Sequence, residues 1–313
     1  MGARGPVGLF GRTSSSPSTL PVCLYGMRCT GRRSPRAADL HVKAKDVVPG
    51  VFSRHAAAYR DRLMDAAARG ETRSRVRTLE LLAVSPGERV LDLGCGPGTL
   101  TFQLVEAASD SGLVVGVDLA RGMLALARAD AAPPPLLVQM DLEQLAFGDG
   151  VFDAVASGHS LHFCPDLAAA LAEARRVLRQ GGRFAASVPL SVPGRSRLLD
   201  DLINELAPPV PELADLKTTQ ELLADVPRLR AALMSAGFRT ASVENVEEVA
   251  SYSSPEELVS KTMSWWAFAW RLESLSEEDQ ERIQAQALRR LKERVGGGPL
   301  EMAGTSIVMF ALA

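Results

Sequence analysis

The sequence predicts an α/β fold in which helices cover both faces of a mainly parallel sheet. In the middle of the chain, short apolar runs alternate with helix-length amphipathic runs, as in consecutive strand–helix–strand units. Glycine and aspartate residues separate these runs and mark the turns between them. The 313 residues are 46% hydrophobic and 23% charged, with a net charge of −2, which is typical of a globular chain with a sizeable core.

The first 38 residues differ from the rest because they carry six arginines, many Ser, Gly and Pro residues, and no acid before Asp39. We expect a disordered basic tail over residues 1–45, since this composition offers little periodic apolar surface. Arginine with serine also suits an organelle transit peptide, but proline and glycine would interrupt its amphipathic helix. A native tail, a transit peptide and an added leader all stay open. Six arginines without an interleaved aromatic platform are weak evidence of nucleic-acid binding, so we expect no nucleic-acid partner.

Helical spacing of apolar residues begins near Val51 and continues through Tyr59 and Leu63, and a second helical run covers 74–82. Pro86 and Gly87 end this region. We therefore assign residues 46–85 to an N-terminal helical lid. Residues 86–313 form the main domain, with helical cap insertions at about 190–230 and 253–300.

Expected strands and helices then follow in order. The expected strands cover 90–93, 113–117, 136–138, 152–156, 183–188, 243–249 and 305–312. The expected helices cover 100–108, 122–129 and 167–178, with an irregular helical stretch over 195–237 and further helices over 255–295.

A glycine-rich turn follows the first expected strand and reads Asp92-Leu93-Gly94-Cys95-Gly96-Pro97-Gly98. Glycines let the backbone approach a ligand, and the start of the next helix offers free amide donors. The spacing departs from the G-x-G-x-x-G pattern of nicotinamide-binding loops. We interpret Cys95 as a small apolar filler, because no basic residue lies beside it to activate a thiol.

Two further acids follow the next two expected strands. Asp118 ends the run 113–117, where a carboxylate can accept hydrogen bonds from both hydroxyls of a ribose. Asp141 follows 136–138 and is placed to accept from an exocyclic amine such as that of adenine, with the Leu142 amide nearby. Ligands of open α/β sheets bind at the carboxyl ends of the strands, so these groups together predict one nucleoside site. Each acid alone could instead cap a turn or face solvent.

Over residues 51–188 these motifs resemble the class I S-adenosylmethionine-dependent methyltransferases, in the ubiquinone/menaquinone-type small-molecule branch. The resemblance implies a Rossmann-like, doubly wound sheet of seven mostly parallel strands, with 305–312 as the antiparallel seventh. It also implies S-adenosylmethionine as the cofactor, with the glycine loop at the methionine part and apolar side chains around the adenine. The cofactor-binding residues expected from it are Asp92, Gly94, Cys95, Gly96, Gly98, Asp118, Leu119, Met123, Asp141, Leu142 and Ser157.

Methyl transfer is an in-line displacement, so alignment of the acceptor is the main task of the protein and can contribute about 7–11 kcal/mol. A base adds roughly 10²- to 10⁴-fold where the acceptor must lose a proton. The resemblance places the loop with His159 and His162 against the transferable methyl group. We expect His159 to be the base or to orient the acceptor, with His55 and Tyr59 as competing catalytic residues. The alternative is that His159 only lines the pocket.

The acceptor pocket is expected to include the lid, the histidine loop and an aromatic run in the second cap insertion. Phe52 and Tyr59 would fold over the cofactor, and helical spacing places Trp266 and Trp270 on one face. Packing of the cap onto the sheet explains these tryptophans equally well. The expected acceptor contacts are Phe52, His162, Phe163, Trp266 and Trp270, and the opposite wall could contain Leu202, Ile203, Leu206 and Pro208-Pro209.

Several classes are disfavoured. The loop Ser157-Gly158-His159-Ser160 lacks the Asn/Asp-Pro-Pro-aromatic motif of nucleobase methyltransferases, and no carboxylate cluster predicts a metal. Four cysteines without paired spacing favour a cytoplasmic protein, and no apolar run approaches the roughly 18–20 residues that cross a bilayer.

We therefore expect methylation of an oxygen or carbon atom of a hydrophobic small molecule, such as a quinone, polyketide, phenol or terpenoid-like metabolite. A homodimer is left open. The alternatives are a cofactor-binding cyclase or regulator that transfers no methyl group, and an NAD-dependent oxidoreductase.

Overall fold

The computed structural model describes residues 42–190, 205–208, 213–263 and 266–313, with the backbone alone at Trp266 and Ala267. The expected tail falls outside these ranges except for its last residues, and Ala44 and Lys45 are already helical. Leu202, Ile203, Pro209 and Trp265 also lie outside the described residues.

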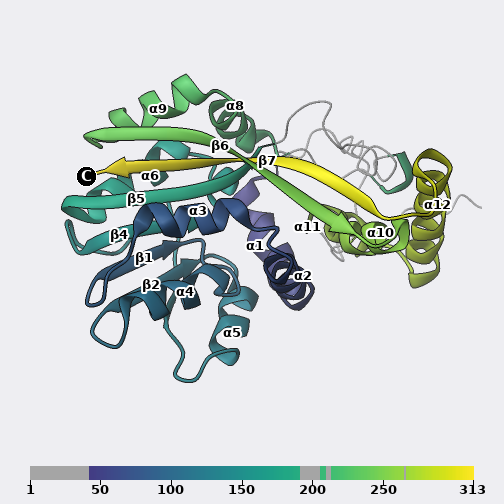
Figure 1. Ribbon diagram of the computed structural model, residues 1–313, viewed down its shortest axis with the longest axis horizontal. Helices are drawn as coiled ribbons and strands as arrows, with labels where there is room; N and C mark the ends of the chain where they lie inside the picture. Colours follow the sequence, from purple (N-terminus) through teal and green to yellow (C-terminus); the bar gives the residue numbers. More distant parts are fainter. Residues whose placement is uncertain (1–41, 191–204, 209–212, 264–265) are drawn as a thin grey trace, which may run out of the picture. The chain divides into compact units, whose positions relative to one another are not determined.

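The described strands form one seven-stranded sheet in the order β3-β2-β1-β4-β5-β7-β6 (Figure 1). Their bounds are β1 Arg89–Leu93, β2 Leu113–Asp118, β3 Leu136–Gln139, β4 Phe152–Gly158, β5 Leu178–Leu190, β6 Thr240–Tyr252 and β7 Leu300–Leu312. The first five strands pair in parallel, and β7 lies antiparallel between β5 and β6. The predicted doubly wound sheet is confirmed, with its change of direction between β1 and β4.

The lid contains three helices: α1 Ala44–Arg54, α2 Ala56–Ala68 and α3 Arg73–Leu82. The helices and short 3-10 turns of the main domain are α4 Thr99–Ala108, α5 Arg121–Ala129, η2 Leu161–Phe163, α6 Leu167–Val177, η3 Ala214–Leu216, α8 Lys217–Leu223 and α9 Val226–Ser235. The C-terminal cap contains α10 Pro255–Met263, α11 Trp266–Leu272 and α12 Glu277–Val295. No helix within the described ranges is both long and apolar enough to cross a membrane.

Successive side chains of each strand point to opposite faces of the sheet. In β1, Val90 packs in a cluster with α3 and α4, whereas Leu91 packs in a cluster with α6 and α9. Both are fully buried, so the apolar run of β1 reads as continuous rather than alternating. This explains why a parallel sheet covered on both faces could be predicted from the sequence.

The last two strands are longer than predicted. The sequence predicted strands over 243–249 and 305–312, but β6 and β7 each have 13 residues. Leu190 with Thr305 is the last pair between β5 and β7 within the described residues, and β6 and β7 continue to pair as far as Tyr252 and Leu300, as a ribbon. Figure 1 shows the ribbon running to α10 and α12. There Tyr252 joins a separate core with the cap helices.

Candidate active site

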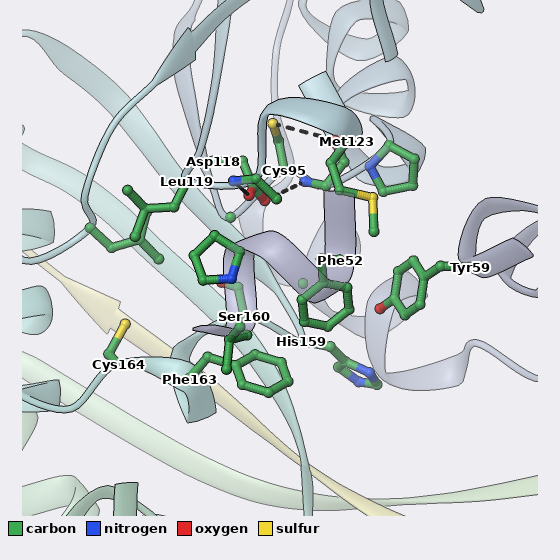
Figure 2. Close-up of a pocket in the computed structure, with 18 of the residues that line it drawn as sticks. Phe52, Tyr59, Cys95, Asp118, Leu119, Met123, His159, Ser160, Phe163 and Cys164 are labelled. Atoms are coloured by element: carbon green, nitrogen blue, oxygen red, sulfur yellow. Dashed lines mark hydrogen bonds between the residues drawn. The ribbon is translucent and has the colours of Figure 1, made fainter. Parts of the chain in front are cut away.

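A cavity lies at the carboxyl ends of β1, β2, β3 and β4, next to the change of strand direction (Figure 2). Ligands of open α/β sheets bind at this position. Helices α1 and α2 form the other wall. The predicted site residues that line the cavity are Phe52, Tyr59, Gly94, Cys95, Gly96, Asp118, Leu119, Met123, Asp141, Leu142, His159 and Phe163.

The glycine loop leaves open space at Gly96. Gly94, Gly96 and Gly98 all have positive φ angles, of 67°, 54° and 86°, which glycine adopts without steric cost. A Cβ atom on Gly94 would lie 2.2 Å from Cβ of Ser160, and one on Gly98 would lie 2.8 Å from the ring of Phe102. A Cβ atom on Gly96 would meet no protein atom within 4 Å. Gly96 therefore offers bare backbone to a ligand, whereas Gly98, which is not in the cavity wall, starts α4.

Asp118 joins the glycine loop to the start of α5. Its Oδ2 accepts a hydrogen bond from the Gly96 amide at 2.9 Å, and its Oδ1 accepts one from the Ala120 amide at 2.7 Å. Burial raises the pKa of this carboxyl group, although the backbone donors act in the opposite direction. Each carboxylate oxygen has a second lone pair, so the group can also accept from two ribose hydroxyls. Figure 2 shows Asp118 with Leu119 and Met123 along one side of the cavity.

Asp141 contacts the lid. Its Oδ1 accepts from the Glu143 amide at 3.0 Å, and its Oδ2 accepts from Nζ of Lys45 at 2.6 Å. Lys45 also donates to Glu143 at 2.5 Å, and these two acids raise the lysine pKa although burial opposes them. The sequence analysis missed Lys45 because it assigned this residue to the tail. No local signal links it to an acid 96 positions away.

Two further predicted cofactor residues lie within strands β1 and β4 and do not line the cavity. Asp92 is fully buried, and its Oδ2 accepts from Oγ1 of Thr101 at 2.6 Å. Its Oδ1 has no partner within the described ranges, and burial raises the pKa of Asp92 to about 7. Ser157 is also fully buried, and its Oγ lies 2.6 Å from Oγ of Ser160. Asp92 therefore joins β1 to α4, and Ser157 contacts Ser160, whose hydroxyl donates to the Leu93 carbonyl at the end of β1.

His159 lines the cavity directly after β4, in a left-handed backbone conformation with φ of 60°. This conformation is uncommon outside glycine. Its amide donates to the Ser187 carbonyl at 2.8 Å, and its Nε2 lies 2.9 Å from Oγ of Ser74. Burial lowers its pKa well below the usual value, with smaller contributions from Arg75 and His162. The ring is therefore neutral at physiological pH.

Of the other two predicted catalytic residues, one lines the cavity and one does not. Tyr59 lines the cavity, and its ring packs edge-to-face on Phe52 at 5.2 Å. Phe52 makes a similar contact with Phe163 at 5.3 Å, so the lid and the loop after β4 share one aromatic cluster. His55 is outside the cavity wall, and its Nε2 lies 3.0 Å from Glu273 of the cap.

Two predicted acceptor contacts are absent from the cavity wall. His162 packs on Phe163 at 4.0 Å between ring centroids, and its buried Nδ1 has no partner among the residues described. Burial, assisted by Arg75, lowers the pKa of His162 to about 3. Trp270 belongs to α11 in the cap and does not line the cavity, while the side chain of Trp266 lies outside the described residues.

Arg75 is the second residue that the sequence analysis missed. It is 9% exposed, it lines the cavity, and its guanidinium group makes no hydrogen bond or ion pair with any described residue. Its Nε lies 3.4 Å from the position that a Cβ atom would take on Gly158. Arg75 shares the buried face of α3 with Thr78 and Leu82, at spacings of three and seven residues. This helical spacing could have placed Arg75 on the buried face. However, Arg73 and Arg77 on the same helix made Arg75 resemble one of several exposed arginines.

The described residues contain no group of three or more His, Cys, Asp or Glu side chains that could hold a metal ion. The site instead combines open backbone at a glycine loop, carboxylates at successive strand ends, an unpaired guanidinium group, a neutral imidazole and an aromatic wall. Such a set can hold a nucleoside that carries an amino acid, and it can align a second molecule beside it.

Comparison with known proteins identifies the family. A family model described as a methyltransferase domain matches residues 91–186. Nocamycin O-methyltransferase of Saccharothrix syringae is 30% identical over 247 residues, which cover 72% of this chain and 85% of that protein. Two shorter alignments at 36% identity involve aklanonic acid methyltransferase DauC of Streptomyces sp. (strain C5) and 2-phytyl-1,4-naphtoquinone methyltransferase of Synechococcus elongatus. They cover 42% and 47% of this chain.

These shorter alignments span 62% and 65% of the two relatives, so the chain matches less than two thirds of their length. The nocamycin enzyme, by contrast, is matched over most of its length. By its sheet order, its glycine loop and this relative, the chain belongs to the class I S-adenosylmethionine-dependent methyltransferases.

Proposed function

We propose that this protein transfers a methyl group from S-adenosylmethionine to an oxygen or carbon atom of a hydrophobic small molecule. The observation that carries the proposal is that one cavity contains Gly96, Asp118, Asp141 and His159, which follow four neighbouring strands. The acceptor class is a quinone, polyketide, phenol or terpenoid-like metabolite. The names of relatives that act on aklanonic acid and a naphtoquinone favour this class.

The cavity residues fit the cofactor from end to end. The open space at Gly96 accommodates the methionine part, Asp118 accepts from the ribose, and Asp141 with the Leu142 amide contacts the adenine edge. We assign the carboxylate of the cofactor to Arg75, because this buried guanidinium group makes no hydrogen bond or ion pair with any described residue, and Asp92 acts on it through its charge without such a pair. A buried charge without a partner is costly, so a carboxylate there is strongly favoured. When bound, S-adenosylmethionine supplies a methyl group on a positively charged sulfur.

The protein then aligns the acceptor and excludes water. Phe52, Tyr59 and Phe163 form an apolar wall contributed by both the lid and the loop after β4. Such a wall suits a flat, hydrophobic acceptor. His159 lies beside it and can contact an oxygen of the acceptor, either by taking its proton or by donating a hydrogen bond. Neither role needs a metal.

The proposal is tested in two steps on the purified full chain. Calorimetry with S-adenosylmethionine, S-adenosylhomocysteine and NAD should show binding of the first two only. Incubation with a panel of hydroxylated quinones, phenols and 1,3-dicarbonyl compounds should then release S-adenosylhomocysteine together with a methylated product. Binding without release for any acceptor would favour a cyclase or regulator. Binding of NAD alone would favour an oxidoreductase and contradict the proposal.

A further inference from the structure

Ser74 and His159 form a hydrogen-bonded pair at the cavity wall. Ser74 is fully buried at the start of α3 and does not line the cavity, whereas His159 does. Oγ of Ser74 lies 2.9 Å from Nε2 of His159, and this nitrogen is the only hydrogen-bond partner of that hydroxyl within the described ranges. The backbone of Ser74 is occupied elsewhere, since its amide donates to Glu248 and its carbonyl accepts from Thr78.

The direction of this hydrogen bond decides which imidazole nitrogen carries the proton. A proton on Nε2 would be donated to Ser74, and the hydroxyl proton of Ser74 would then have no acceptor. A proton on Nδ1 leaves Nε2 free to accept from Ser74, so the hydroxyl proton of Ser74 has its acceptor. Nδ1 is not among the buried polar atoms that lack a partner, and His159 lines the cavity, so its N–H can be satisfied from the cavity side. An unsatisfied buried donor costs more than one hydrogen bond contributes. The second arrangement is therefore favoured.

We infer that Ser74 holds His159 with its proton on Nδ1, so that His159 donates a hydrogen bond to an oxygen of the acceptor and does not act as its base. Nδ1 of His159 has no partner among the described residues, and Figure 2 shows the ring with the other side chains that line the cavity. This inference rests on the proposed function and narrows its acceptor class. The acceptor carries a carbonyl or ionised oxygen, as the enolate of a 1,3-dicarbonyl or an acidic phenolate does.

The charges around His159 support a donor role. Arg75 on α3 and His162 on η2 both disfavour a second proton on the ring, in addition to burial. Glu248 on β6 reaches this pair only through the Ser74 amide. A base would become a cation next to the guanidinium group of Arg75, whereas a donor stays neutral. The left-handed backbone of His159, fixed by its bond to Ser187, holds the ring in this place.

The chemical step then balances without a protein base. The acidic acceptor loses its proton to solvent before it binds. Its anionic oxygen or carbon forms the bond to the methyl carbon while the carbon–sulfur bond breaks, and that electron pair stays on sulfur. The negative charge of the acceptor and the positive charge of the sulfonium cancel. His159 keeps its proton throughout and stabilises the anionic oxygen.

The tautomer can be measured without cofactor or acceptor, so this test is independent of the proposed function. Long-range ¹H–¹⁵N correlation spectra of the full chain, labelled on its four histidines, distinguish protonated Nδ1 from protonated Nε2. The signals lost in His159→Asn assign this residue. We expect protonated Nδ1 in the wild type and a mixture of tautomers in Ser74→Ala. Protonated Nε2 in the wild type would overturn the inference.

Turnover gives the second test. Asparagine tolerates a positive φ and can place an amide N–H near the position of Nδ1–H, but it cannot act as a base. We expect His159→Asn to retain kcat within about tenfold and His159→Ala to lose about 10²-fold or more. S-adenosylhomocysteine affinity reports whether each variant is folded. Equal losses in two folded variants would identify His159 as a base, whereas a wild type that methylates no acceptor would count against the proposed function and leave the tautomer measurement intact.

Discussion

At the scale of single residues, Asp92 combines complete burial, one unpartnered oxygen and a pKa raised to about 7 by that burial. Its unfolded pKa is near 3.9, so the unfolded chain ionises this group at lower pH than the folded protein. The stability that Asp92 provides while protonated is therefore complete below about pH 4 and is lost as the pH rises through about 7. The glycine loop thus directly follows a strand whose buried carboxyl group opposes folding at neutral pH.

Asp92→Asn should remove this pH dependence. Between pH 4 and pH 8 we expect the wild type to lose up to about 4 kcal/mol of unfolding free energy that the variant keeps, from about 1.4 kcal/mol per pKa unit. Urea unfolding at several pH values measures the difference. Asp110→Asn, at an exposed turn residue, is the matched control and should follow the wild type. Parallel curves for Asp92→Asn and the wild type would contradict the prediction.

The glycine loop offers a second test at the residue scale. Gly96→Ala should abolish S-adenosylhomocysteine binding, because the added methyl group enters the cavity. It should cost only about 1–2 kcal/mol of stability, because the methyl group meets no protein atom and the cost comes from the positive φ angle alone. Gly94→Ala should reduce both, because its Cβ atom would overlap Ser160. Calorimetry and thermal unfolding of the two variants check this contrast. Retained binding in Gly96→Ala would show that the ligand does not contact this backbone.

The site residues that could be predicted from sequence follow strands directly. Asp118 and Asp141 were found because each comes after a short apolar run, and the carboxyl ends of parallel strands meet at one edge. Lys45 and Ser74 were missed because they lie on lid helices, and their contacts join segments about 85 to 100 residues apart. Local periodicity carries no information about such pairs.

At the scale of elements, helix α1 is joined to the loop after β3, where we propose that the nucleoside binds. Lys45 bridges Asp141 and Glu143, and Phe52 on the same helix packs on Phe163. The side chain of Lys45 is 30% exposed, so each ion pair should contribute no more than about 1 kcal/mol. We expect contacts of this strength to allow α1 to open and close over a bound nucleoside.

Lys45→Met should loosen α1 and increase the dissociation rate of S-adenosylhomocysteine by up to about tenfold, since two weak ion pairs are lost. Stopped-flow fluorescence or surface plasmon resonance measures this rate. Lys43→Met, at the exposed position before α1, is the control and should leave it unchanged. Tighter binding by Lys45→Met would contradict the prediction, because it would mean that the lysine competes with the adenine amine for Asp141.

At the scale of the whole molecule, the described chain contains two main cores. The first covers both faces of the sheet, with α6 and α9 on one face and α3 and α4 on the other, and the second joins the end of the β6–β7 ribbon to the cap helices. The sequence analysis predicted helices for this cap but not the ribbon that carries it, because the ribbon depends on pairing of Tyr252 with Leu300 across 48 positions. The aromatic run proposed for the acceptor pocket contributes Phe268 to the second core.

The cap also forms ion pairs with the lid. Glu273, directly after α11, pairs with Arg54 and His55, and Lys261 of α10 lies 3.3 Å from Asp65. These ion pairs between the lid and the cap are partly exposed, so each one alone contributes little to stability. We therefore expect motions of the cap to reach the cavity through α1 and α2, while the strand ends, where we propose that the cofactor binds, stay in place.

Leu291→Ala tests whether the cap unfolds separately from the sheet. Leu291 is fully buried in the second core, and truncation of such a leucine typically costs about 2–5 kcal/mol. We expect faster amide exchange in α10 and α12, unchanged exchange in β1 and β4, and S-adenosylhomocysteine affinity within about threefold of the wild type. Leu171→Ala in the sheet core is the matched control and should accelerate exchange throughout. If Leu291→Ala also accelerated exchange in β1 and β4, the two cores would unfold as one cooperative unit, and the cap could not move independently during turnover.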